Sequence, residues 1–548
     1  MKKINAFLLV VILFLAAGCS NNDLADKTTA PLGVTSILSS PVGDVVGKIT
    51  VGYQGWFACA GDGQPVQNWW WHWTSDWGQL PSNSNKGIKA WPVVTDYTTT
   101  YLTGYSNLGN GNPAKLYSCY QQQTVTTQFQ WMQQNGIDCA ALQRFNPNTD
   151  EGPMRDAVAA RVKIAAEATG RKFLIMYDVT GWTNMQTEMK TDWTNKMKTY
   201  TTSSAYANQN GKPVVCIWGF GFNDTQHPWS AAVCLDVINW FKSQGCYVIG
   251  GVPREWRTGV NGSRSGYINV YHAFNMLSPW LIGAIGNIAD ADNHYTNFLL
   301  SDQTDCNANG VDYQPCVLPG DLSLRQRLHG DLMWRQFYNA IKAGCQGIYI
   351  SMYDEYNEGN QIAKTAPDAS WIPAGSGFLG LDEDGTWCSS DYYLRLTGDG
   401  GKMLKGQIAL TTTRPTNPGG TTGGTGTIPG TIQAENYTAM SGIQTETTSD
   451  TGGGLDVGWI DTGDWIEFTV NVPASGNYTI NYRVASPNSG GIIEFKENGV
   501  YRAEASIPNT GGWQTWVIVK ATVYLNSGTR TIRLTANSGG WNINWWSV

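Results

Sequence analysis

The chain has 548 residues, which is more than one ordinary hydrophobic core organises, so two or more domains are expected. Charged residues make up only 14% of it, well below the roughly 25% of an average soluble domain, and a net charge of -7 argues against a nucleic-acid partner. The 25 Trp and 25 Tyr residues offer flat faces with a hydrogen-bonding edge, which suits sugars, although most of these aromatics are expected in the core.

Residues 1–19 have the features of an export signal. Lys2 and Lys3 precede an apolar run, and small residues stand before Cys19. This pattern resembles the bacterial lipoprotein signal, in which the cysteine becomes the lipidated first residue of the mature chain; a plain secretory signal with a chance cysteine is the alternative. The resemblance implies a lipid anchor as the only contact with a membrane, at the outer membrane and cell surface or on the periplasmic face. Residues 20–45 are small and polar and are expected to be a spacer.

Residues 46–409 alternate short apolar runs with helical patterns. Segment 154–170, for example, repeats apolar residues at spacings of three and four and ends in glycine. The expected strands are 49–56, 138–145, 172–179, 213–220, 246–252, 278–285, 313–320 and 347–354. Eight strands with intervening helices predict an α/β fold of the (β/α)8 TIM-barrel type, with a doubly wound open sheet as the alternative.

Thr, Gly and Pro dominate residues 410–430, which are predicted to be a linker. Residues 431–548 change to an alternating pattern with Gly, Asn, Pro and Ser turns, which predicts an all-β jelly-roll sandwich.

Ten cysteines follow Cys19, and none has the spacing of a zinc site. An exported chain permits disulfides, and Cys306 with Cys316 would close a short loop. Three others lie in apolar runs and are expected to be free core thiols, namely Cys139, Cys216 and Cys246.

Three acids stand within five residues at the end of the last predicted strand: Asp354, Glu355 and Glu358. Active sites of such barrels form where the strands end, so these acids are expected to face the residues that end the other strands. Those residues are Tyr53, Trp56, Arg144, Asp178, Trp218, Arg254 and Trp280. Two carboxyl groups are what glycosidic bond cleavage requires. A structural role, in which the acids cap a helix or pair on the rim, fits the spacing equally well.

The segments DEYNEGNQI (354–362) and YQPCVLPGD (313–321) resemble two motifs of glycoside hydrolase family 99, the endo-α-mannosidases, and of related family 71-like sequences. The resemblance extends over roughly residues 46–400. It implies that Glu355 is the base acting on the sugar's own 2-hydroxyl and Glu358 the acid/base at the glycosidic oxygen, in a retaining reaction on an α-mannan-type substrate without a catalytic cofactor. Tyr356 and Asn357 stand where the family has Trp and His, so a neighbouring branch is indicated.

Six residues are predicted to contact the substrate: Tyr53, His72, Asp178, Trp218, Arg254 and Tyr353. For His72 a structural role is an equal alternative. Asp354 is expected to support the site from behind the two glutamates.

The C-terminal segments IQAENYTAMSG (432–442), DVGWIDTGDWIEFTV (456–470), TGGWQTW (510–516) and WNINWWSV (541–548) resemble the family 6 carbohydrate-binding modules. The resemblance implies that Trp459 and Trp513 enclose a sugar ring and that Asn542 binds its hydroxyls. It also implies a structural calcium ion, for which Gln433, Glu435 and Asn544 are the matching oxygen ligands.

The combined prediction is a monomeric lipoprotein that hydrolyses a polysaccharide or glycan, with the module holding the polymer near the barrel. One alternative keeps the fold and changes the substrate to xylan, arabinoxylan or another β-linked plant polysaccharide. Another is a non-catalytic lipoprotein that captures glycans.

Overall fold

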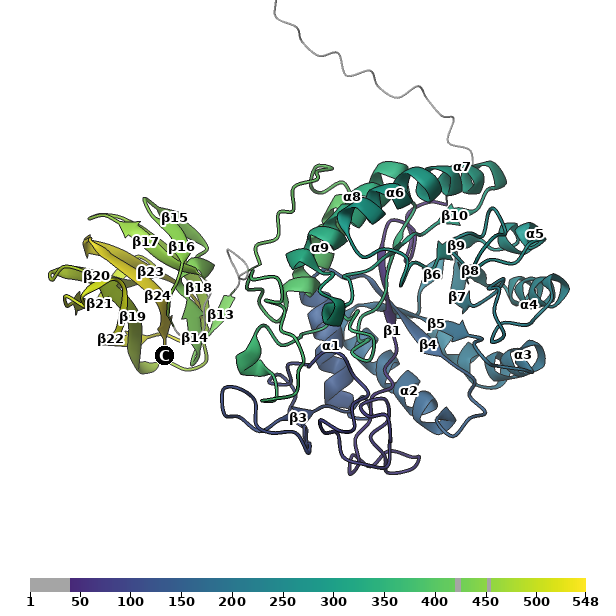
Figure 1. The fold of residues 1–548 in the computed structure, drawn as a ribbon, viewed down its shortest axis with the longest axis horizontal. Helices are drawn as coiled ribbons and strands as arrows, with labels where there is room; N and C mark the ends of the chain where they lie inside the picture. The colour runs from purple at the N-terminus through teal and green to yellow at the C-terminus, as the bar shows by residue number, and fades with distance from the viewer. Residues whose placement is uncertain (1–39, 419–424, 451–454) are drawn as a thin grey trace, which may run out of the picture. The chain divides into compact units, whose positions relative to one another are not determined.

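The computed structural model describes residues 40–418, 425–450 and 455–548. Cys19 and the predicted signal and spacer up to residue 39 lie outside the described residues. Figure 1 shows a body of mixed helices and strands followed in the chain by an all-β body. Within the described ranges, no helix has the length and apolar character needed to cross a membrane.

The first body is built on a parallel sheet in which each strand pairs with the next in a ring. The strands are β1 (Ile49–Tyr53), β4 (Cys139–Arg144), β5 (Lys172–Asp178), β7 (Lys212–Trp218), β8 (Tyr247–Val252), β9 (Met276–Pro279), β10 (Asp312–Tyr313), β11 (Cys316–Val317) and β12 (Ile348–Ile350). Three short strands lie outside the ring: β2 (Tyr101–Leu102), β3 (Lys115–Leu116) and β6 (Asn208–Gln209).

The ring closes through a seventh strand that is broken in the middle. Its first half, β10, pairs with β9, and its second half, β11, pairs with β12, which in turn pairs with β1. Pro315 lies at the break, where its missing N–H removes one rung of the ladder. The predicted eight-stranded (β/α)8 barrel is therefore confirmed, with β10 and β11 counted as one strand.

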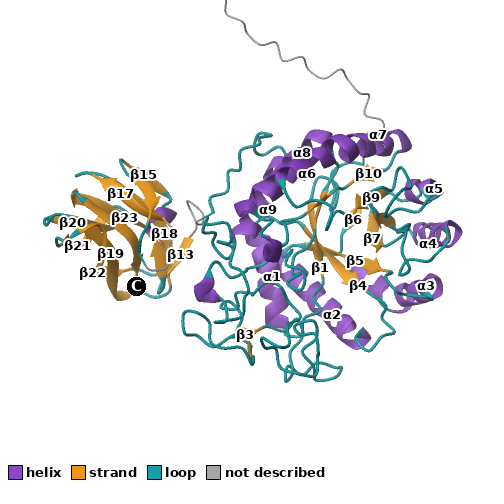
Figure 2. Ribbon diagram, viewed as in Figure 1, coloured by secondary structure: helices purple, strands orange, loops and turns teal. Residues whose placement is uncertain are grey.

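Helices surround the strands, as Figure 2 shows. They are α1 (Gln122–Gln134), α2 (Gly152–Thr169), α3 (Met185–Asn195), α4 (Ala231–Ser243), α5 (Ile268–His272), α6 (Ile288–His294), α7 (Leu300–Asn309), α8 (Asp331–Ala343) and α9 (Tyr392–Leu404). In α2 the buried residues include Val158, Val162 and Ala165, and the helix ends at Gly170, whose φ of 64° suits glycine.

The sixth strand lies upstream of the predicted segment 278–285. Strand β9 ends at Pro279, and residues 281–284 form a turn closed by the bond from Ala284 N to Leu281 O. A proline cannot donate to the ladder, which explains why the strand ends at Pro279 although the apolar run continues beyond it.

Alternation along the strands decides which side chains face the barrel interior. Residues from seven strands line a small internal cavity, among them Met176, Cys216, Trp218 and Tyr349, and Trp280 lines it from the position after β9. The neighbours of these residues point outward to the helices. Tyr177 on β5, for example, donates from its hydroxyl to Asp192 of α3 at 2.9 Å.

The second body is a sandwich of two mostly antiparallel sheets. One contains β13 (Thr425–Thr427), β15 (Ala439–Ser441), β18 (Trp465–Val472), β20 (Gly491–Glu497), β21 (Val500–Ile507) and β23 (Gly528–Ser538). The other contains β14 (Thr431–Gln433), β16 (Gln444–Thr447), β17 (Leu455–Ile460), β19 (Gly476–Ser486), β22 (Gly512–Leu525) and β24 (Trp541–Ser547). Phe468 and Phe495 of the first sheet pack edge-on against Trp546 of the second. The predicted sandwich is confirmed.

The first residues of the predicted linker contact the barrel. Trp334 Nε1 of α8 donates to Thr411 O at 3.1 Å, and Thr416 Oγ1 donates to Asp399 Oδ2 of α9 at 2.7 Å. This part of the linker is held by side chains of the outer helices.

All ten cysteines within the described ranges are free. The possible Cys306–Cys316 bridge is therefore not formed, whereas Cys139, Cys216 and Cys246 are buried free thiols, as predicted.

Candidate active site and carbohydrate cleft

The acidic segment after β12 is fixed to the end of β1 by Asp354. Its two carboxylate oxygens accept hydrogen bonds from Gln54 N and Gly55 N, each at 2.8 Å. Asp354 is fully buried, and burial raises its pKa to about 6 although both backbone bonds oppose this. Asp354 therefore anchors the loop that carries the two glutamates.

Glu355 is buried beside Asp354 but is only half satisfied. Gln54 Nε2 donates to Glu355 Oε1 at 3.1 Å, whereas Oε2 has no partner among the described residues. Burial raises the pKa of Glu355 well above its usual value, and the nearby Glu358 and Asp354 raise it further. A desolvated carboxyl group with one free oxygen is a strong candidate for proton transfer.

Glu358 lies one turn further along the loop, where Glu358 N donates to Glu355 O at 3.2 Å. This residue is exposed at the rim. Desolvation raises the pKa of its carboxyl group, Lys89 lowers it, and Asp321 raises it. Lys89 itself pairs with Asp321 at 2.9 Å, so an ion pair lies beside the outer glutamate.

Arg327 holds the far end of the same loop. Its buried guanidinium donates through Nη2 to Gly359 O and Gln361 O, both at 2.8 Å. Gly359 has a φ of 76°, and a Cβ there would come within 2.7 Å of the Asp321 carboxylate. The Gly in the motif is therefore required by both conformation and space.

Residues in or directly after four strands also place polar or indole groups at the mouth. Gln54, Gln143 and Trp218 each have a buried polar side-chain atom without a partner among the described residues. Asp178 ends β5, is 5% exposed and accepts through Oδ1 from Thr180 N and Thr180 Oγ1. Burial raises its pKa, while these bonds lower it. The mouth thus presents amide, indole and carboxyl groups, which can form hydrogen bonds with the hydroxyl groups of a sugar.

Two of the predicted substrate-binding residues lie in the core instead. Tyr53 and Tyr353 are fully buried, and their hydroxyls donate to Gln128 Oε1 at 2.6 Å and Gln128 O at 3.0 Å. Arg144 is also buried, with two bonds of 2.6 Å to Asp192. Each of these side chains points outward from its strand or loop to the helices, so its polar atoms are used within the protein.

The other predicted residues lie on the mouth side. His72 stacks on Trp56 with 3.8 Å between ring centroids, and its Nε2 lies 3.0 Å from Glu151 Oε2. Burial lowers the pKa of His72, against the opposing effect of Glu151. Arg254 donates through Nε to Glu255 Oε1 at 2.9 Å. Trp218 packs edge-on against Trp280, 5.3 Å away.

The sequence analysis did not predict Gln54 or Gln143 as site residues. Gln54 directly follows Tyr53, and Gln143 directly precedes Arg144. Counting alternate residues from Asp178 and Trp218 would have found them, because the strand register fixes which side chains face inward. Lys89 lies in a long loop after β1, where no periodicity could have indicated its position.

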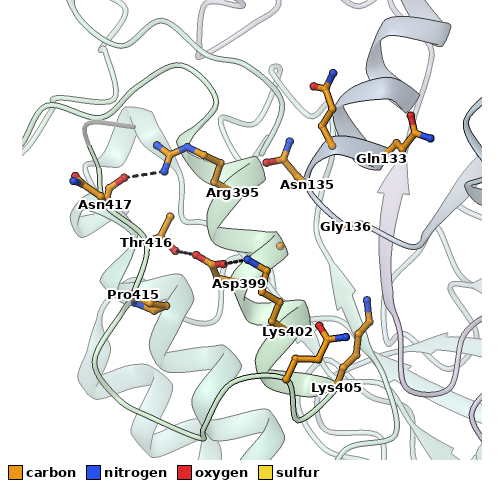
Figure 3. A pocket seen from close by; sticks show the side chains of 13 residues that line it. Gln133, Asn135, Gly136, Arg395, Asp399, Lys402, Lys405, Pro415, Thr416 and Asn417 are labelled. Carbon is orange, nitrogen blue, oxygen red and sulfur yellow. Dashed lines mark hydrogen bonds and ion pairs between the residues drawn. The ribbon is translucent and has the colours of Figure 1, made fainter. Parts of the chain in front are cut away.

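A second cavity, of about 520 Å³, lies away from the mouth between the end of α1 and α9 (Figure 3). Its cations are paired with carboxylates: Arg395 with Asp391, Lys402 with Asp399 and Lys405 with Asp138. It offers no carboxyl pair comparable to that of the mouth.

In the sandwich the three predicted sugar-binding residues lie together. Trp459 is 53% exposed and Trp513 is 47% exposed, while Asn542 is buried and donates to Trp513 O at 3.2 Å. A bulge in β17 between Val457 and Ile460 gives Trp459 a φ of 52° and turns its indole outward.

Carboxyl groups hold the base of this cleft. Asn542 Nδ2 donates to Glu446 Oε1 at 2.8 Å and to Asp456 Oδ2 at 3.0 Å, and Gln514 Nε2 donates to Asp456 Oδ1 at 3.1 Å. Burial raises the pKa of Asp456 to about 6, Gln514 lowers it and Glu446 raises it. Glu446 and Asp456 were not predicted from the sequence. They are opposite residues on the neighbouring strands β16 and β17, and a sequence pattern does not show which residues of two strands lie opposite each other.

The predicted calcium ligands have suitable free oxygens. Glu435 Oε2 and Asn544 Oδ1 are buried without a partner among the described residues, and burial raises the pKa of Glu435 to about 8. No group of three or more His, Cys, Asp or Glu side chains in the described ranges could hold a metal. An ion at this position would therefore need amide oxygens such as those of Gln433 and Asn544, which suits a hard cation.

Comparison with known proteins gives a family for the second body. Residues 433–548 match the model of the carbohydrate binding module (family 6). The clotting factor G alpha subunit of Tachypleus tridentatus is 41% identical over 117 residues, covering 21% of this chain and 17% of that protein. The β-agarase AgaA of Microbulbifer thermotolerans is 32% identical over 96 residues, covering 17% of this chain and 22% of that protein. The chain thus spans less than a quarter of the length of either relative.

Solved structures give two further similarities. A family 6 module from Cellvibrio mixtus lichenase 5A, in complex with cellotriose, is 50% identical over 22% of this chain and 94% of that chain, with a TM-score of 0.21. The GH99 endo-alpha-mannosidase from Bacteroides thetaiotaomicron is 16% identical over 66% of this chain and 98% of that chain, with a TM-score of 0.49. The residues from 433 to 548, which follow the (β/α)8 barrel in this chain, are therefore a carbohydrate-binding module of family 6.

Proposed function

We propose that the barrel is a glycoside hydrolase whose catalytic pair is Glu355 and Glu358. The observation that carries this proposal is the buried Glu355 carboxyl, which keeps one oxygen free at the barrel mouth, one turn from a second glutamate. The pKa of each carboxyl is raised, so either group holds a proton more readily than a solvated glutamate does.

The mechanism implied by the motif resemblance uses the two glutamates in turn. Glu355 removes the proton of the sugar's 2-hydroxyl, whose oxygen attacks the anomeric carbon. Glu358 protonates the departing glycosidic oxygen, so the C–O bond breaks and a 1,2-anhydro sugar forms. Water, deprotonated by Glu358, then opens this epoxide-like ring at the anomeric carbon, and Glu355 returns its proton to the 2-oxygen. Two inversions leave the anomeric configuration retained.

We propose an α-mannan-type glycan as the substrate, because of the two segments at 313–321 and 354–362 that resemble those of endo-α-mannosidases. A second candidate is a β-linked plant polysaccharide such as xylan or arabinoxylan. It is favoured by the relatives' names, which include a β-agarase and an arabinoxylan arabinofuranohydrolase of Paenibacillus polymyxa.

Incubation of the soluble chain from Asn21 with α-mannan, xylan, arabinoxylan and agarose, followed by sizing of the products, tests both candidates. Shortened mannan would support the first candidate and shortened xylan the second. If none of the polymers is cut but the chain is retarded by one of them in an affinity gel, the protein captures glycans without cleaving them.

Three further features belong to the same proposal. The pattern before Cys19 supports a lipid anchor that keeps a monomeric enzyme at the outer membrane or on its periplasmic side. The free oxygens of Glu435 and Asn544 support a structural calcium ion, with Gln433 as a third ligand. The exposed indoles of Trp459 and Trp513 support a module that keeps the polymer at high local concentration near the barrel.

A further inference from the structure

A chain of hydrogen bonds leads from the barrel mouth into the loop after β7. Asp178 Oδ1 lies 2.6 Å from Thr180 Oγ1, which lies 3.2 Å from His227 Nε2. His227 Nδ1 lies 2.8 Å from Asp224 Oδ1. Asp178 faces the mouth, whereas the Asp224 side chain is 47% exposed on the outer side of the loop.

The number of available protons restricts the protonation states of this series of hydrogen-bonded groups. The Nδ1 atom of His227 faces a carboxylate, which can only accept, so Nδ1 carries a proton. The Thr180 hydroxyl has a single proton to donate. If that proton goes to an ionised Asp178, His227 must donate from Nε2 and is an imidazolium. If it goes to Nε2 of a neutral His227, Asp178 must itself be protonated in order to donate to Thr180.

We propose that Asp178 and His227 share one proton through the Thr180 hydroxyl, and that His227 is thereby a positioning residue that sets the charge Asp178 presents to a sugar hydroxyl. In the transfer, the O–H bond of the Asp178 carboxyl breaks as Thr180 takes that proton. Thr180 gives its own proton to His227 Nε2, where an N–H bond forms. The role toward sugar rests on the proposed function, whereas the sharing of the proton does not.

The surroundings keep the His227 ring away from bulk water. His227 is 5% exposed and is packed among Trp218, Phe222 and Trp229, at centroid distances of 5.6, 5.1 and 6.0 Å. Gly219 has a φ of 113°, and a Cβ there would come within 2.8 Å of the His227 ring. Glycine at this position lets the ring reach Thr180.

Other charged or titratable groups also face the hydrogen-bonded series from Asp178 to Asp224. Arg155 of α2 favours the ionised form of Asp178, and His227 does the same. Cys216 of β7 and Tyr349 of β12 also lie near Asp178, and burial raises the pKa of both, so they remain neutral. On the loop side, Asp224 is the carboxyl that faces His227, and Arg264 donates through Nη2 to Asp224 O at 3.0 Å.

NMR of the soluble chain from Asn21 with ¹³C-labelled histidine tests the sharing directly. The chain has five histidines, so His227→Gln assigns the signal, or the other four His→Gln variants do so by elimination. We expect the Cδ2 signal of His227, whose carbon adjoins Nε2, to move in Asp178→Asn and in Thr180→Val, and to keep its wild-type position in Thr180→Ser. A Cδ2 signal unchanged in both Asp178→Asn and Thr180→Val would overturn the proposal.

Kinetics test the positioning role on whichever polymer the wild type cuts. Thr180→Val should raise KM about tenfold with a smaller effect on kcat and should shift the pH profile, and Thr180→Ser should restore both. His272→Gln is the matched control, because His272 pairs with Asp305 at 2.6 Å between α5 and α7, and it should change neither readout. If no polymer is cut, the proposed hydrolysis fails while the NMR result stands. If Thr180→Val and Thr180→Ser have equal kinetics, the positioning role is wrong.

Discussion

The barrel mouth and the module cleft differ in how far their functional side chains are exposed to water. At the mouth Glu355 is only 5% exposed, whereas in the cleft Trp459 and Trp513 are 53% and 47% exposed. Proton transfer needs a carboxyl group whose surroundings shift its pKa, and burial provides the shift. Sugar stacking needs a flat apolar face that is accessible before the ligand arrives, and the bulge at Trp459 provides it.

Both regions also contain a carboxyl group held by amides, and the difference between the two is informative. Both oxygens of Asp456 accept from side-chain amides, Gln514 on one side and Asn542 on the other. Glu355 accepts from Gln54 through one oxygen only. The fully bonded carboxylate orients a neighbouring amide, while the half-bonded one remains available to react with a substrate.

The largest effects are expected at the mouth. Loss of a general acid typically costs about 10²–10⁴-fold in rate, so Glu358→Gln should nearly abolish hydrolysis of a natural polymer. The aryl oxide of an activated aryl glycoside departs without needing a proton, so the first step on that substrate should be far less affected by Glu358→Gln. Glu355→Gln should be slow on both substrates, because assistance at the ring is lost whatever the leaving group. Release of sugar and of aryl alcohol measures both.

The pH dependence of the same reaction follows from the direction of the shifts. Desolvation raises the pKa of Glu358, so its acid form persists to higher pH than in a solvated glutamate, and activity should decline as pH rises through that value. Lys89→Met should move the decline to higher pH, because Lys89 lowers the pKa of Glu358.

Wild-type rates of polymer hydrolysis in both Glu355→Gln and Glu358→Gln would mean that these two acids are structural.

The sequence predicted the barrel and sandwich well because both depend on local patterns. Eight apolar runs and a turn-rich alternating segment are visible residue by residue. The mouth was predicted less well because facing inward or outward differs by a single residue. Tyr53 and Gln54 are neighbours, yet the first bonds to α1 and the second to Glu355. Lys89 and Asp321 meet across 232 positions, a contact that no spacing predicts.

Calcium distinguishes the two bodies in a second way. If the ion binds at Glu435, chelator should lower the melting temperature of the module's transition and leave that of the barrel unchanged. An ion at 100 times its Kd stabilises the folded state by about 2.7 kcal/mol. Glu435→Gln should remove most of the response to chelator, and calorimetry of the full chain measures both. A module transition that is unaffected by chelator, with no metal bound, would contradict the proposed ion.

The indoles of the cleft should affect binding but not folding. Burying a large side chain contributes about 1.5–3 kcal/mol, so Trp513→Ala should weaken polymer binding roughly 10- to 100-fold. Because Trp513 is half exposed, the melting temperature should remain close to that of the wild type. Affinity gels measure the retention, and Trp516→Ala, on the same strand, serves as the control for loss of an indole. Equal retention of wild type and Trp513→Ala would place the sugar elsewhere.

The smallest effects concern stability, and they should have opposite signs at two adjacent residues of the mouth. Burial raises the pKa of Glu355 in the folded barrel, so the stability that this group contributes is present below its unfolded pKa of about 4.3 and is lost as pH rises through the folded value. Glu355→Gln removes that loss and should raise the melting temperature at pH 8 more than at pH 5. Asp354→Asn should lower it at both, because an amide cannot accept from both Gln54 N and Gly55 N, and one unsatisfied buried N–H costs about 1–3 kcal/mol. The loss should be smaller at pH 8 than at pH 5, because burial raises the pKa of Asp354 to about 6. The effect of Asp354→Asn on the rate should be milder than that of either glutamate variant. Calorimetry of both variants at the two pH values measures the contrast. If Glu355→Gln destabilises the barrel as much as Asp354→Asn does, the buried glutamate is a structural group like its neighbour, and burial at the mouth does not distinguish a reactive carboxyl group from a structural one.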